Sequence, residues 1–87
     1  MKELRQILNH YESDHFPSFA KDYKDRTVEE LETIILEYQS LYAYGDDEGD
    51  RGDLIPPEDW FVFHHWEPST QSEFLAYLAI KIAVLRN

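Results

Sequence analysis

The 87-residue chain contains no cysteine, one methionine and only three glycines. Without cysteine it has no disulfide framework, no thiolate nucleophile and no cysteine-ligated zinc site. It also lacks any apolar run close to the roughly 20 residues that span a bilayer, and no apolar segment of a secretory signal follows Lys2 and Arg5. We therefore expect a reducing, cytoplasmic setting and no role in a membrane.

Positive charge is also scarce: the chain has 18 acidic and only 8 basic residues, which gives a net charge of −10. The imbalance is concentrated in residues 27–73, where 13 acids accompany a single base, Arg51. Such a segment repels nucleic-acid phosphates and anionic lipids, and it attracts basic protein surfaces. The charge pattern thus predicts a protein partner and no direct contact with nucleic acid.

The chain is nevertheless rich in core-forming residues, since 43% are hydrophobic and 15% are aromatic. This composition and length predict one folded domain over residues 1–87. Four apolar residues, Leu4, Ile7, Leu8 and Tyr11, recur with helical spacing and predict a first helix over residues 2–12.

Two further helix starts are marked by proline and by a capping motif. Pro17 suits the first turn of a short helix. Thr27 and Glu30 have the spacing of a capping box, in which each side chain binds the other's backbone amide. An apolar stripe follows without interruption until Gly45, so the sequence predicts a long helix over residues 27–44.

A second motif of this kind, from Thr70 to Glu73, predicts a last helix that ends near Arg86. This helix is apolar nearly all round, which is typical of a central, buried helix. Between the two long helices lie an acidic loop, residues 45–59, and an aromatic segment, residues 60–66, which the periodicity leaves open as strand or helix. The predicted fold is a mostly α, small helical bundle of three longer helices plus one or two short ones.

The acidic loop admits three interpretations: a solvated surface, a contact surface for a basic partner, and a weak calcium site. Arg51 stands where an EF-hand needs its glycine, and Pro57 stands where it needs its bidentate glutamate, so the loop is no EF-hand. We favour the first two interpretations. The acids concerned are Asp46, Asp47, Glu48, Asp50, Asp53, Glu58 and Asp59.

The aromatic segment has the sequence WFVFHHW, and not all of its side chains can face one small core. Part of it is expected in the core, and part is expected at the surface beside the acids, a composition typical of binding hot spots. Tyr42 and Tyr44 precede the loop and extend the same aromatic group.

Metal and catalytic sites are not expected. His10 and His15 are five residues apart, which places them about 140° apart around an α-helix. His64 and His65 are adjacent and diverge. The sequence has no phosphate-cradling glycine motif and no recognisable nucleophile arrangement, so we expect neither a cofactor nor an enzyme.

Residues 29–55 resemble part of the immunity proteins of nuclease colicins. The likeness consists of Glu29-Glu30-Leu31 at a helix start, Tyr38 on that helix, an acidic loop, and Gly52-Asp53-Leu54-Ile55 before the next helix. The resemblance implies an acidic helical inhibitor of a basic nuclease. The sequence departs from the family at Pro56 and Pro57, where the family has two tyrosines that bind the nuclease.

The interpretation that unites these features is a small acidic inhibitor or adaptor that docks residues 27–73 on a basic partner, as immunity proteins and DNA mimics do. Charge would speed the encounter and aromatic residues would anchor it. The alternative is a self-associating structural domain whose acidity serves solubility, although a monomer is expected. The residues predicted to contact the partner are Glu30, Glu37, Tyr42, Tyr44, Asp46, Asp47, Glu48, Asp50, Asp53, Glu58, Asp59, Trp60 and Phe61.

Overall fold

A computed structural model of the chain describes residues 2–44 and 54–86. These residues form five α-helices and one π-helical turn, and no strand occurs among them. The prediction of a mostly α, small helical bundle is confirmed, with two long helices, α3 and α5, and three helices of nine residues or fewer. The predicted acidic loop falls mainly on residues 45–53, outside the described residues. The elements are α1 (Lys2–His10), η1 (Tyr11–His15), α2 (Pro17–Tyr23), α3 (Val28–Tyr44), α4 (Pro57–His65) and α5 (Pro68–Arg86).

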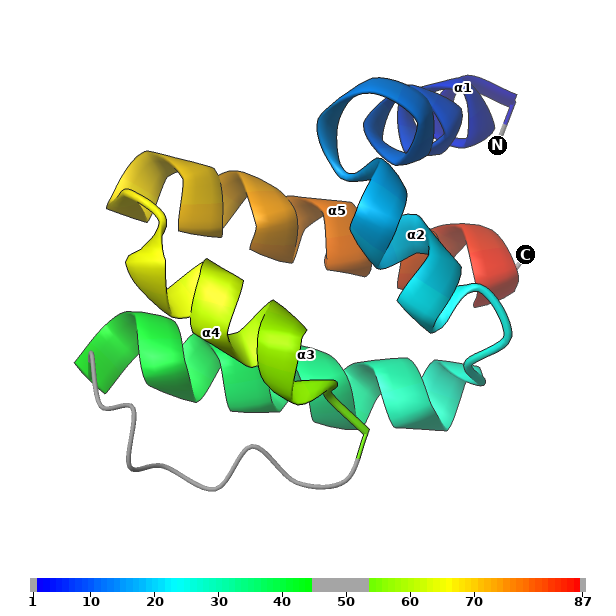
Figure 1. Cartoon of the computed structure of the whole chain (residues 1–87). Helices are drawn as coiled ribbons and strands as arrows, with labels where there is room; N and C mark the ends of the chain where they lie inside the picture. Colours follow the sequence, from blue (N-terminus) through cyan, green and yellow to red (C-terminus); the bar gives the residue numbers. More distant parts are fainter. Residues whose placement is uncertain (1, 45–53, 87) are drawn as a thin grey trace.

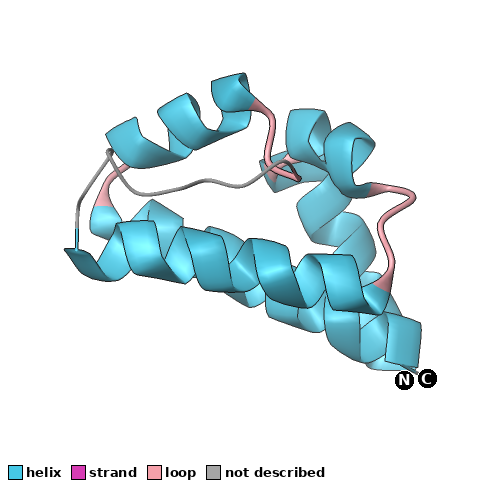
Figure 2. Ribbon diagram, turned by 90° about the horizontal axis from the view of Figure 1, so that it is seen from below, coloured by secondary structure: helices cyan, strands magenta, loops and turns pink. Residues whose placement is uncertain are grey.

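The two longest helices, α3 and α5, run antiparallel and pack along each other (Figure 1). Glu32 near the start of α3 forms an ion pair with Arg86 at the end of α5, as this antiparallel arrangement allows. Helix α4 lies against α3, and α1 lies against α5. The beginning of α1 and the end of α5 lie at the same end of the molecule (Figures 1 and 2).

The start of α3 forms as its capping motif predicts. The Thr27 hydroxyl accepts a hydrogen bond from the Glu30 amide at 3.1 Å, and the Glu30 carboxylate accepts one from the Thr27 amide at 3.0 Å. Both amides belong to the first turn, where no helical carbonyl is available to them, so the box satisfies two donors that would otherwise need water. Arg26 also donates to the Leu54 carbonyl at 3.3 Å, which ties the segment before α4 to this corner.

Two predicted helix boundaries are wrong. The first α-helix ends at His10 and continues as the π-helical turn η1, in which the Phe16 amide donates to the Tyr11 carbonyl at 2.7 Å. The last helix begins at Pro68, so Thr70 lies inside its first turn and does not cap it. Proline at a first helical position accounts for the earlier start, because its ring fixes a helical φ and its missing N–H has no helical partner there.

Proline also shortens the loop. Helix α4 begins at Pro57, so Glu58 and Asp59 lie in its first turn and do not belong to the loop. Acidic residues are favourable at this place because the helix dipole leaves partial positive charge at the N-terminus. The segment 60–66 is therefore helical as far as His65.

The core is mainly aromatic and centres on Phe74 of α5, which is fully buried. Its ring centroid lies 5.0 to 6.4 Å from seven other aromatic rings, which come from α2, α3, α4, α5 and the segments beside them. Large rings at offset and edge-on angles bury much area per residue, which suits a short chain. The expectation that the last helix is central is confirmed by the buried Phe74, Tyr77 and Leu78.

Candidate functional site

Helix α4 is held in one orientation by two of its aromatic side chains. Phe63 is fully buried and its ring centroid lies 4.6 Å from that of Tyr38, while Trp60 is 9% exposed and lies 5.9 Å from the same ring. At the end of the helix, the buried Gln71 donates from Nε2 to the Phe63 carbonyl at 2.7 Å. The same carbonyl accepts a hydrogen bond from the Trp66 amide at 3.1 Å, so Gln71 adds a second donor from α5 to the C-terminal turn of α4. The outward side of α4 is therefore fixed relative to the bundle.

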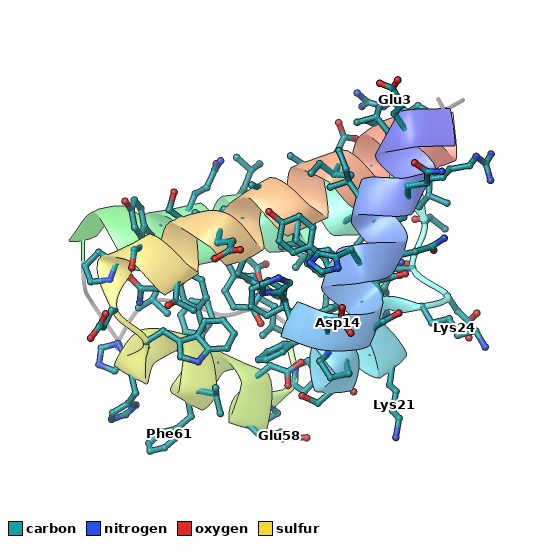
Figure 3. All side chains as sticks on the ribbon, turned by 90° about the horizontal axis from the view of Figure 1, so that it is seen from above. Glu3, Asp14, Lys21, Lys24, Glu58 and Phe61 are labelled. Carbon is teal, nitrogen blue, oxygen red and sulfur yellow. The ribbon has the colours of Figure 1, made fainter. Side chains whose placement is uncertain are left out.

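That outward side carries Glu58, Phe61, Val62 and His65, which share one face because they are spaced at three and four residues. We call these four residues the outer α4 face. Phe61 is 64% exposed and Val62 is 41% exposed. Figure 3 shows Glu58 and Phe61 pointing away from the bundle. A large aromatic side chain is thus presented to solvent beside a carboxylate.

Phe61 is supported by His65. Their ring centroids are 4.3 Å apart, and His65 Nδ1 lies 2.8 Å from the Phe61 carbonyl oxygen, a distance at which Nδ1–H donates. The two rings restrict each other, so less side-chain freedom remains to be lost when a partner covers Phe61. A preordered aromatic residue with a polar rim is typical of a protein contact site.

Two residues predicted to contact a partner are buried. Trp60 belongs to the core, and Asp59 is 6% exposed. The pKa of the Asp59 carboxyl is raised to about 7, mainly by burial and, second, by a hydrogen bond with the Asp22 carboxyl. Asp59 therefore supplies much less negative charge to the surface near neutral pH than the sequence implied.

Three other residues that were predicted to contact a partner lie on α3. Glu30 is engaged with Thr27 and, at 3.4 Å, with Arg26, and the Thr27 backbone amide is the main cause that lowers its pKa. Glu37 is partly buried, and Tyr42 is 42% exposed. The remaining predicted contacts lie outside the described side chains: Tyr44, Asp46, Asp47, Glu48, Asp50 and Asp53.

The bases near the acidic half are used within the protein. Arg86 pairs with Glu32, and Lys81 pairs with Glu12 at 2.8 Å. Arg86 therefore offsets one acid of residues 27–73, whereas the charge of Lys81 is balanced by an acid outside this range.

Two members of the outer α4 face, Val62 and His65, were not predicted. The sequence pattern that could have predicted them is Pro57 followed by two acids, which is typical of a helix start. Counting three, four and seven residues on from Glu58 then gives Phe61, Val62 and His65.

The prediction that His10 and His15 lie about 140° apart around a helix is wrong. The turn η1 is π-helical, and residues five apart then lie on one side, so the two ring centroids are 4.9 Å apart. No cluster of three or more potential metal ligands occurs among the residues that the structure describes.

Within the described ranges, no helix is long and apolar enough to cross a membrane. No protein-family model, curated protein or solved structure matches the chain, so the partial likeness to immunity proteins gains no support from these comparisons.

Proposed function

We propose that this protein is a small acidic inhibitor or adaptor that binds a basic protein surface, with the outer α4 face as its anchor. The observation that carries the proposal is the 64% exposure of Phe61 on a helix whose other side is fixed in the core. Burying a phenylalanine side chain on binding gains about 1.5 to 3 kcal/mol, which offsets part of the cost of association.

Charge supports the same partner chemistry. Residues 27–73 hold 13 acids and one base, and the outer α4 face lies inside this range. A negative field of this kind increases the rate of encounter with a basic surface, and the effect weakens as salt screens it. The basic partners that fit include proteins that normally hold nucleic acid, because their binding surfaces are positively charged.

For the partner so identified, Phe61→Ala is expected to weaken binding at least about tenfold, because it removes the desolvated anchor. Leu36→Ala is a matched control, since Leu36 is also 64% exposed but lies on α3. The affinities of the wild type and both variants are compared by calorimetry or surface plasmon resonance. Equal affinities for wild type and Phe61→Ala would contradict the proposal that the outer α4 face anchors the partner.

The alternative, a self-associating structural domain, is favoured by a second surface feature. A groove of about 390 Å³ runs between α3 and α5 and is lined mainly by apolar side chains, among them Ile35, Leu36 and Ile82. A second copy of the chain that covered this groove would bury the exposed Leu36. Sedimentation separates the two functions: our proposal expects a monomer, and a dimer that persists in high salt and is lost in Leu36→Ala would favour the alternative.

A further inference from the structure

The π-helical turn η1 brings His10 and His15 together at the surface. Their Nε2 atoms are 3.2 Å apart, and the rings meet edge to face at 71°. In an α-helix these positions would diverge by about 140°. A π turn is rare and is frequently found at functional sites, so this local distortion is the first sign that the pair has a role.

Each histidine also has a carboxylate on its other ring nitrogen. Asp14 Oδ2 lies 3.1 Å from His10 Nδ1, and Glu73 Oε1 lies 3.8 Å from His15 Nδ1. Metal-binding histidines commonly donate their second N–H to a carboxylate, which fixes the ring and its tautomer and strengthens the nitrogen as a ligand. Asp14 lies at hydrogen-bond distance from His10 and fits this pattern, whereas Glu73 is a longer ionic contact to His15. The two Nε2 atoms lie next to each other at the surface.

The pair is open to solvent. The side chains of His10 and His15 are 59% and 42% exposed, and together with Gln6, Ile7, Tyr11 and Glu73 they line a surface groove of about 440 Å³. An ion reaches them without any rearrangement of the core, and water can fill its remaining coordination positions.

We propose that His10 and His15 bind a divalent transition-metal ion, such as Zn²⁺, Ni²⁺ or Cu²⁺, through their Nε2 atoms. With metal–nitrogen distances of about 2.0 to 2.1 Å, nitrogens 3.2 Å apart subtend an angle of about 100° at the ion, close to the tetrahedral and octahedral values. The proton that now joins the two Nε2 atoms moves to His15 Nδ1, facing Glu73, or leaves to solvent if that nitrogen already carries one. Two protein ligands and water make this a site of modest affinity.

The test is calorimetric titration of the full, untagged chain with Zn²⁺ and with Ni²⁺. We expect one ion per chain, and His10→Ala and His15→Ala should each weaken binding at least about tenfold. His64→Ala is the control, because it removes a histidine from another pair, His64 and His65 on α4, whose ring centroids are 5.2 Å apart. It should bind as the wild type does.

Asp14→Asn tests the positioning role of the carboxylate and should weaken binding about tenfold with the stoichiometry unchanged. A nitrogen-15 spectrum of the imidazoles gives a second readout, in which the metal shifts both Nε2 signals of His10 and His15. Undiminished binding in His10→Ala and His15→Ala, or no binding by the wild type at millimolar metal, would overturn the proposal. Either result leaves the proposed partner surface on α4 unaffected.

Discussion

Replacing Glu12 by alanine is expected to lower the free energy of unfolding by about 3 kcal/mol. Glu12 Oε2 accepts hydrogen bonds from Lys81 Nζ at 2.8 Å and from the Tyr77 hydroxyl at 2.9 Å. Lys81 is only 7% exposed and Tyr77 is fully buried. The substitution leaves a buried ammonium group without its counter-charge and a buried hydroxyl without its acceptor, and both are expensive to desolvate.

A double-mutant cycle by urea denaturation separates the lost pair from a general loss of packing. Lys81→Met should cost less than Glu12→Ala, because the remaining Glu12 is partly exposed and can bind water. Glu12→Ala with Lys81→Met should recover a large part of the loss. Glu3→Ala, an exposed acid on α1, is the control and should change stability by no more than about 0.5 kcal/mol. A cost for Glu12→Ala that the second substitution leaves unchanged would show that the ion pair is not its cause.

Replacing Asp59 by asparagine is expected to raise the free energy of unfolding by about 2 kcal/mol at pH 8 and to have little effect at pH 4. Burial raises the pKa of Asp59 to about 7, and its Oδ2 atom has no hydrogen-bond partner. The asparagine side chain has nearly the same shape, carries no charge, and can donate to Asp22 as the protonated carboxyl does.

The direction of the pH dependence follows from proton binding. Between the ordinary value of 3.8 and about 7, the folded protein keeps a proton on Asp59 that the unfolded chain has released. Stability therefore falls as the pH rises through this window, by up to about 1.4 kcal/mol per pH unit from this group. Below the window both states are protonated, and above it the full cost of the buried charge applies.

The measurement is urea denaturation of wild type and Asp59→Asn at several values from pH 4 to pH 8. Ionisable groups other than Asp59 contribute equally to both proteins and cancel in the difference. Glu58→Gln, which neutralises the exposed neighbour, is the control and should leave the pH dependence of the wild type intact. A destabilising effect of Asp59→Asn at pH 8 would mean that the charged carboxylate is stabilised in the fold.

Much of the helical framework follows from local sequence signals. The Thr27–Glu30 box predicts the start of α3 because the interactions that form it are confined to one turn. Pro17 predicts the start of α2 for the same reason. The apolar stripe that follows Thr27 predicts how far α3 extends, because helical periodicity depends only on the chain itself.

The features that were missed depend on contacts between distant segments. The turn η1 becomes π-helical where Tyr11 stacks on Phe16 and Glu12 reaches Lys81, 69 residues further on. Similarly, Asp59 is buried because Trp60 and Phe63 dock α4 on α3, which the periodicity of seven residues does not reveal. The number of acids in this segment of the sequence is therefore larger than the number of carboxylates exposed on α4, because Asp59 is buried.

The central claim, that the acidic half of the chain binds a basic protein, is tested most directly by capture from a lysate of the protein's own host. Tagged wild type and Phe61→Ala are washed at low and at high salt, and the retained proteins are identified by mass spectrometry. We predict one basic protein, retained by the wild type at low salt, lost at high salt, and depleted in Phe61→Ala. Recovery of the chain alone, or of the same proteins by both forms at both salt concentrations, would contradict the account.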